Sequence, residues 1–141
     1  MDFINSFESN GCFIVVDDDV VNNLICRKII NHVFPKADVQ TFVNPETALI
    51  YIKSIYTDSN GKPTILLLDI NMPILSGWDF LEEFESFKSS IKRQIKIYML
   101  SSSREPQDKD RASKNKNVYG YIEKPLSKEI ITEMVILKHK L

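Results

Sequence analysis

CFIVVDDDVVNN, residues 12–23, joins an almost uniformly apolar run to three consecutive aspartates, and the chain then turns apolar again. The run at residues 12–16 is typical of a strand that is covered on both faces of its sheet. Carboxylates packed this closely repel one another unless positive charge lies between them. The stretch therefore predicts a buried strand that ends at a site for a cation.

Four further apolar runs predict strands, at residues 37–43, 64–69, 95–100 and 118–122. The run at 64–69 is as apolar as the first, whereas the run at 37–43 is mixed and fits an edge strand. Helical patterns lie between the strands, at residues 20–34, 45–56, 78–87 and 126–141. Asn44 is the expected N-cap of the second helix, with Pro45 at its first position.

The helical periodicity also predicts which side chains face the core. In residues 20–34, recurring polar pairs leave one apolar face. The expected core positions of the later helices are Ala48, Leu49, Ile52, Ile55 and Tyr56, then Trp78, Leu81 and Phe84, and finally Ile130, Ile131, Met134 and Leu137.

The segment at residues 103–117 is nearly all polar, with Ala112 its only core-like residue. It fits either a mostly exposed helix or a long loop. A structureless loop of this length is unusual inside a compact domain, which favours the helix.

Strands that alternate with helices indicate an α/β fold with a parallel sheet. Ligands of such folds bind beyond the carboxyl ends of the strands, so the residues that end each strand should be considered together. These residues are Asp17, Asp18 and Asp19, then Asp69, then Ser101, Ser102 and Ser103, and finally Lys124 with Pro125. Taken singly, each has an ordinary structural role; Asp19 in particular is the expected cap of the first helix.

Taken together, these residues could bind a metal ion and a phosphoryl group. Clustered carboxylates without histidine or cysteine are hard oxygen ligands that suit Mg²⁺, which commonly takes phosphate oxygens as further ligands. A lysine and a hydroxyl beside the metal can hold the remaining phosphoryl oxygens. A carboxylate at such a site can attack phosphorus and form an aspartyl-phosphate.

At these positions the chain resembles the receiver domain of two-component response regulators. The matching motifs are VVDDD (15–19), LLLDINMPILSG (66–77), MLSSS (99–103) and YIEKPL (121–126), and the resemblance runs from Gly11 to the C-terminus. It implies a flavodoxin-like, doubly wound (βα)₅ fold with a five-stranded parallel sheet in the order 2-1-3-4-5. Residues 1–10 are expected to be an N-terminal lead, and residues 11–141 the receiver domain.

The resemblance also implies roles for single residues. Asp69 corresponds to the phosphoacceptor, Asp18 to a direct Mg²⁺ (or Mn²⁺) ligand and Asp17 to its acidic neighbour, which acts mainly through water. The backbone carbonyl of Asn71 would complete the protein's share of the metal shell. Lys124 would pair with the phosphoryl group, with Pro125 following in a cis peptide.

Ser101 corresponds to the switch hydroxyl, which is more often threonine in the family, and Tyr121 to the switch aromatic residue. Asn71 and Ser103 occupy the positions that tune how fast the phosphate is lost. The implied output is a change in the face formed by residues 103–117, the strand at 118–122 and the last helix.

The function implied is transfer of a phosphoryl group to Asp69 from a histidine kinase or phosphotransfer protein, followed by slow self-dephosphorylation. The chain is then a signalling domain and not an enzyme acting on a separate substrate. Because it ends at Leu141, after the last expected helix, a stand-alone receiver is expected that either binds a downstream protein or passes its phosphate onward; a receiver excised from a larger protein is the alternative.

The composition agrees with a cytoplasmic signalling domain. Net charge is −1, from 18 basic and 19 acidic residues, and gives no reason to expect nucleic acid or a membrane surface as partner. No signal peptide or membrane span is visible. Cys12 and Cys26 fit buried free thiols better than a disulfide, and His32 and His139 fit surface histidines.

Three alternatives remain open at this stage. A degenerate receiver could serve only as a scaffold. A metal-dependent phosphatase of the haloacid-dehalogenase type would use Asp17 and Asp19, but it would leave the DINMP segment without a role. A flavin-binding protein of the same topology would need a loop that favours phosphate after the first strand, and here that loop is acidic.

Trp78 is the only tryptophan in the chain. It fits equally a fluorescent reporter of metal binding and an inert core residue.

Overall fold

The computed structural model describes residues 7, 11–57 and 62–136. Its centre is a five-stranded sheet in the order β2-β1-β3-β4-β5, with every neighbouring pair parallel. The strands are β1 (Cys12–Val16), β2 (Asp38–Phe42), β3 (Thr64–Leu68), β4 (Ile95–Ser101) and β5 (Val118–Glu123). This topology confirms the predicted flavodoxin-like fold, and β2 is an edge strand as expected.

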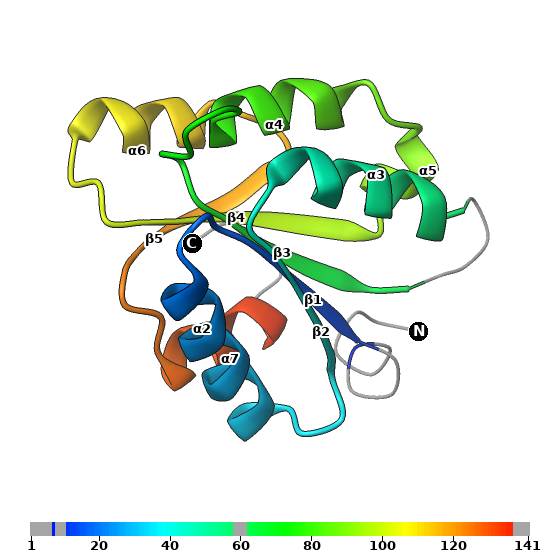
Figure 1. Cartoon of the computed structure of the whole chain (residues 1–141), viewed down its shortest axis with the longest axis vertical. Helices are drawn as coiled ribbons and strands as arrows, with labels where there is room; N and C mark the ends of the chain where they lie inside the picture. Colours follow the sequence, from blue (N-terminus) through cyan, green and yellow to red (C-terminus); the bar gives the residue numbers. More distant parts are fainter. Residues whose placement is uncertain (1–6, 8–10, 58–61, 137–141) are drawn as a thin grey trace.

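Helices cover both faces of the sheet (Figure 1). One face carries α2 (Val20–Val33) and α7 (Lys128–Ile136), which pack against each other. The other face carries α3 (Pro45–Ile55), α4 (Gly77–Glu85) and α6 (Pro106–Ser113). A short helix, α5 (Ser89–Lys92), was not predicted, because four residues are too few to show a periodicity.

The core has two layers, one on each face of the sheet. Along β1, Ile14 and Val16 belong to the layer under α3, α4 and α6, whereas Phe13 and Val15 belong to the layer under α2 and α7. This alternation explains why a strand buried on both faces is apolar throughout.

The helix caps follow the sequence expectations. Asn44 caps α3 through its side chain, with Pro45 at the start of the helix. Asp19 caps α2 by accepting from the backbone N–H groups of Val21 and Asn22. The polar segment at 103–117 does contain a helix, α6, and Ala112 is its only buried residue.

In α4, Trp78 is partly buried and packs against the core layer that contains the fully buried Phe80. The predicted helix faces are wrong in two places. Ile55 is 43% exposed and does not join the core face of α3. In α2 the apolar residues do not form a single face: Cys26 and Ile30 are buried, but four others are exposed. We call these four the α2 apolar stripe; they are Val20, Val21, Leu24 and Ile25.

Both cysteines are buried free thiols, as predicted, and burial raises the pKa of Cys12 to about 11 and that of Cys26 to about 12. His32 is exposed. The positions of His139, Leu137 and most of the predicted N-terminal lead fall outside the described residues. Among the helices that are described, none combines the length and the apolar character needed to cross a membrane.

Candidate functional site

The strand register brings the predicted acidic residues to one edge of the sheet. Val16 of β1 pairs with Leu68 of β3, so the residues that follow them, Asp17 and Asp69, leave neighbouring strands at the same level. Carboxylate oxygens of Asp17, Asp18 and Asp69 lie within 4.8 Å of one another. Asp17 and Asp69 are buried, whereas Asp18 is exposed.

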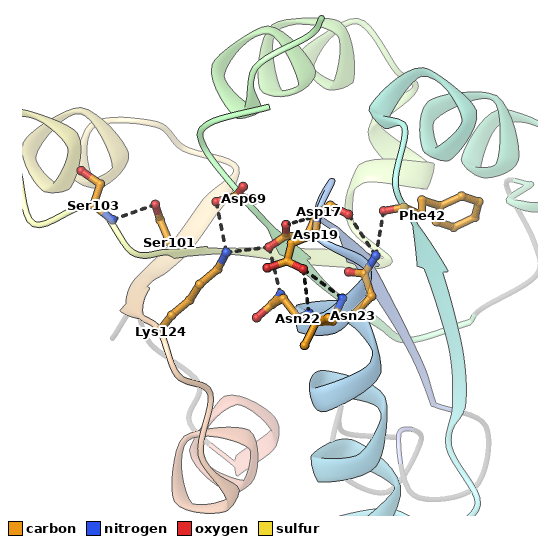
Figure 2. A network of polar contacts seen from close by, with 10 residues as sticks. Asp17, Asp19, Asn22, Asn23, Phe42, Asp69, Ser101, Ser103 and Lys124 are labelled. Carbon is orange, nitrogen blue, oxygen red and sulfur yellow. Dashed lines mark hydrogen bonds and ion pairs between the residues drawn. The ribbon is translucent and has the colours of Figure 1, made fainter. Parts of the chain in front are cut away.

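Lys124, which follows β5, reaches into this group (Figure 2). Its Nζ lies 2.7 Å from Oδ2 of Asp17 and 3.7 Å from Oδ1 of Asp69. Its backbone N–H donates to the carbonyl of Ser101 at 2.9 Å, which joins the ends of β5 and β4. The Lys124–Pro125 peptide is cis, as the resemblance to the family implied.

The electrostatics of the site favour a bound cation. Burial and the charge of Asp17 raise the pKa of Asp69 to about 6, and Lys124 offsets only part of this. Burial opposes the charge of Lys124, but its hydrogen bond to Asp17 and the nearby carboxylates raise the pKa of this lysine on balance. One lysine therefore does not balance the carboxylates.

The donor set fits a hard divalent cation. Three carboxylates from two loops offer oxygen atoms that converge without a nitrogen or sulfur ligand among them, which is the chemistry that Mg²⁺ or Mn²⁺ prefers. Asn71 lies exposed on the loop after β3, two residues beyond Asp69.

The loop after β3 is held close to Asp69 by Gly77. The N–H of Gly77 donates to the carbonyl of Ile70 at 2.8 Å. A Cβ added at Gly77 would lie 2.4 Å from the backbone oxygen of Asp69, so only glycine allows α4 to begin this close to the site. Ser76 and Asp79 form a capping box that fixes the start of the helix.

The two predicted switch residues are linked through the backbone of Ser103. Ser101 is fully buried, and its hydroxyl accepts from the N–H of Ser103 at 3.1 Å (Figure 2). The hydroxyl of Tyr121 donates to the carbonyl of Ser103 at 2.8 Å. The Ser103 hydroxyl itself donates to Asp108 of α6 at 2.6 Å, so this loop is tied to that helix.

Trp78, the second residue of α4, contacts α6. The guanidinium group of Arg111, on α6, stacks on its ring at 4.4 Å from the centroid. This cation–π contact links α4 to α6.

Two residues of the site were not singled out from the sequence. Asn22 donates from Nδ2 to Oδ2 of Asp17 at 2.9 Å. Asn23 is buried and donates to the backbone carbonyls of Asp17 at 2.9 Å and Phe42 at 3.4 Å. Their position one turn after the aspartates, at the start of a helix, was the only available signal.

Comparisons with known proteins agree with this geometry. Residues 13–136 match the family model of the response regulator receiver domain. A two-component response regulator from Cytophaga hutchinsonii has a similar structure (TM-score 0.78, 26% identity, covering 90% of this chain and 97% of that chain). So does a response regulator receiver protein from Dyadobacter fermentans (TM-score 0.80, 26% identity, coverage 88% and 94%).

The chemotaxis protein CheY4 of Vibrio cholerae shares the fold at 20% identity, with a TM-score of 0.70 and coverage of 89% and 95%. No curated protein sequence matches the chain at a significant level.

Proposed function

The chain belongs to the response regulator receiver domain family, and we propose that it accepts a phosphoryl group on Asp69 in a Mg²⁺-dependent reaction. The observation that carries the proposal is the group formed by Asp69, Asp17, Asp18 and Lys124 at one edge of the sheet. Complementary chemistry from several strand ends meets there, as expected for a site at the carboxyl edge of a parallel sheet.

The proposed donor is the phosphohistidine of a histidine kinase or phosphotransfer protein. An oxygen of the Asp69 carboxylate attacks the phosphorus atom and forms a P–O bond. The P–N bond of the phosphohistidine breaks, and its electron pair remains on the imidazole nitrogen. The products are an aspartyl-phosphate and a neutral histidine once that nitrogen has taken up a proton.

The proposed metal ligands are Asp17, Asp18, Asp69 and the backbone carbonyl of Asn71, and a bound Mg²⁺ or Mn²⁺ supplies positive charge against the phosphoryl oxygens. Lys124 supplies a second positive charge. It already lies 3.7 Å from Asp69, so a small movement away from Asp17 suffices for it to contact a phosphoryl group on Asp69.

In this proposal a protein donor reaches Asp69 at the carboxyl edge of the sheet, where the acidic cluster lies. The α2 apolar stripe lies on the first turns of the helix that follows Asp18 and Asp19. Clustered exposed apolar side chains mark protein interaction surfaces. We therefore assign the α2 apolar stripe to contact with the phosphodonor protein.

The proposed output surface is the face formed by α6, β5 and α7. Ser101 and Tyr121 both form hydrogen bonds with the backbone of Ser103. The hydroxyl of Ser103 in turn donates a hydrogen bond to Asp108 of α6. A pocket of about 290 Å³ lies between α6 and β5 and is lined by Lys109, Ala112, Ser113, Val118, Tyr119, Gly120 and Tyr121. A change at the Ser101 hydroxyl is therefore transmitted toward a surface that can receive a partner side chain, the downstream target being a protein.

In this proposal the chain catalyses only its own phosphorylation and slow dephosphorylation. Asn71 and Ser103 set the rate of phosphate loss through their position beside the site. The Ser103 hydroxyl is engaged with Asp108 in this structure, so its influence on hydrolysis depends on release of that hydrogen bond.

The decisive experiment is intact mass spectrometry after incubation with acetyl phosphate, with and without Mg²⁺, on the wild type and on Asp69→Asn. A single phosphoryl adduct that needs Mg²⁺ and is absent from the variant is the expected result. If the wild type forms no adduct and also binds no beryllofluoride in the presence of Mg²⁺, the chain is a scaffold and the proposal is wrong.

A further inference from the structure

The two asparagines that close the stretch CFIVVDDDVVNN have no part in the reaction proposed above, yet both contact Asp17. Asn22 binds the carboxylate and Asn23 binds the backbone carbonyl of the same residue. Figure 2 shows the two amide groups approaching Asp17 from the first turn of α2. The first turn of this helix therefore holds both the side chain and the main chain of one acidic residue.

The side chain of Asp17 is almost saturated with hydrogen bonds. An ionised carboxylate has two oxygens with about four acceptor positions in all. Oδ1 accepts from the N–H of Asp19 at 2.8 Å. Oδ2 accepts from Asn22 at 2.9 Å and from Lys124 at 2.7 Å. About one acceptor position is left for a metal ion or a water molecule bound to it.

The two donors on Oδ2 are not equivalent. Lys124 is shared with Asp69 and is needed there once Asp69 carries a phosphoryl group. Asn22 is not shared in this way, because its amide belongs to the helix that starts after Asp19, and the cap of Asp19 fixes that start. When Lys124 leaves Asp17, Asn22 is the side-chain donor that remains on Oδ2.

We propose that Asn22 is a positioning residue for the metal site: it fixes the plane of the Asp17 carboxylate, so that the free acceptor position stays directed into the carboxylate cluster. The inference rests on the proposed function for the movement of Lys124, but its effect on metal binding does not require phosphorylation. Partners of this kind around metal ligands commonly change metal affinity by tenfold or more.

Asn23 anchors the first turn of α2 to the ends of two strands. It is only 5% exposed, and it joins the ends of β1 and β2 through Asp17 and Phe42. Its Oδ1 is a buried oxygen without a hydrogen-bond partner among the described residues. Such an atom lowers stability, so the benefit of Asn23 lies in its two donated hydrogen bonds.

The test compares Mg²⁺ binding by isothermal titration calorimetry in the wild type, Asn22→Ala, Asn22→Gln and Asn31→Ala. Asn31 is exposed on the same helix and serves as the matched control. We expect Asn22→Ala to weaken Mg²⁺ binding about tenfold, Asn22→Gln to recover most of the affinity through its amide, and Asn31→Ala to bind as the wild type does. Circular dichroism and thermal unfolding verify that each variant is folded.

A second measurement separates positioning from a general loss of structure. With acetyl phosphate as donor, the Mg²⁺ concentration for half-maximal adduct formation should rise about tenfold in Asn22→Ala, and Asn22→Gln should return it close to that of the wild type. Equal Mg²⁺ affinity in Asn22→Ala and the wild type would overturn the inference, and so would an equal loss in Asn31→Ala. If the wild type binds Mg²⁺ but forms neither an adduct nor a beryllofluoride complex, the proposed function fails, and the calorimetry still decides the role of Asn22.

Discussion

Asp69 carries the main electrostatic cost of the site. An acid whose pKa is raised by folding binds its proton more tightly in the folded state than in the unfolded state. Its contribution to stability therefore falls as the pH rises from about 4, the ordinary aspartate value, to about 6, the value in the fold. Above that pH range the buried, ionised carboxylate lowers the free energy of unfolding of the metal-free protein by a constant amount.

Asp69→Asn should consequently stabilise the metal-free protein, and more so at neutral pH. The difference between the two pKa values predicts a gain at pH 7 that is about 2 kcal/mol larger than the gain at pH 4.5. Urea unfolding in EDTA at the two pH values measures it, with the exposed Glu82→Gln as control. A gain that does not change with pH would show that burial of the Asp69 charge is not its source.

Gly77→Ala tests the close approach of α4 to the site. In an ordinary helix position alanine is more stabilising than glycine. Here the added Cβ would meet the backbone oxygen of Asp69 at 2.4 Å, so the loop must move, and we expect a loss of about 1–3 kcal/mol.

Thermal unfolding measures the stability of Gly77→Ala, and calorimetry should show weaker Mg²⁺ binding because Asp69 is displaced. Thr47→Ala, at an exposed site in α3, is the neutral control. A Gly77→Ala variant as stable as the wild type would mean that the loop relaxes without cost.

At the scale of elements, three parts of α2 have different uses. Its buried side packs on the sheet and α7, its first turn holds Asp17, and the α2 apolar stripe faces solvent. A helix that only needed to pack would place polar residues at those exposed positions.

Leu24→Glu should separate the packing role of α2 from its role in docking. Leu24 is 53% exposed, so a charge there costs little folding energy but disrupts an apolar contact with a protein donor. We expect phosphotransfer from a phosphorylated histidine phosphotransfer protein to fall by about tenfold or more, with phosphorylation by acetyl phosphate unchanged.

Ile50→Glu is the matched control for Leu24→Glu, because Ile50 is 66% exposed on α3. It should leave both reactions intact. If Leu24→Glu slows both donors equally, the stripe acts on the site itself and not on docking.

The helix α6 is held more weakly than α4. It buries one residue, Ala112, whereas α4 buries Gly77, Phe80, Leu81 and Phe84. Hydrogen exchange should therefore be at least about tenfold faster in residues 106–113 than in residues 77–85.

Addition of Mg²⁺ and beryllofluoride should change exchange across residues 101–126, since the Ser103 backbone connects both switch residues to α6. Identical exchange with and without this phosphate mimic would remove α6 from the proposed output surface.

On the scale of the whole molecule, Mg²⁺ should act as a stabilising ligand. A ligand that binds only the folded state at 100 times its dissociation constant adds about 2.7 kcal/mol. The melting temperature should rise by several degrees with Mg²⁺ and return on addition of EDTA. Asp69→Asn, which lacks one of the converging carboxylates, should gain less from Mg²⁺. An equal gain in both proteins would place the ion elsewhere.

Much of the architecture could be predicted from the sequence, because parallel sheets impose strong patterns. The uniformly apolar strands β1 and β3 indicated a sheet covered on both faces, and this placed Asp17 and Asp69 at a common edge. Strand and helix ends differed from the prediction by one or two residues in most elements, as is usual for such boundaries.

The remaining features depend on tertiary contacts, which the periodicity of the sequence does not reveal. Apolar residues occur around most of α2, so only packing against α7 and the sheet decides that Cys26 is buried and Leu24 is not. The preference of Lys124 for Asp17 over Asp69 is a difference of 1.0 Å, from 2.7 Å and 3.7 Å. The contact of Asn22 required the geometry of a capped first turn.

The stacking of Arg111 on Trp78 supplies the protein with an optical label of its own. The indole is the only one in the chain, and its cationic neighbour belongs to the helix expected to move. Emission from this ring should respond whenever α6 shifts, because the guanidinium group leaves or approaches its face. Stopped-flow recording of that emission can time the arrival of the signal at α6 in the unlabelled protein, and chemical quench can time bond formation at Asp69. The delay between the two traces is the interval that communication across the domain requires.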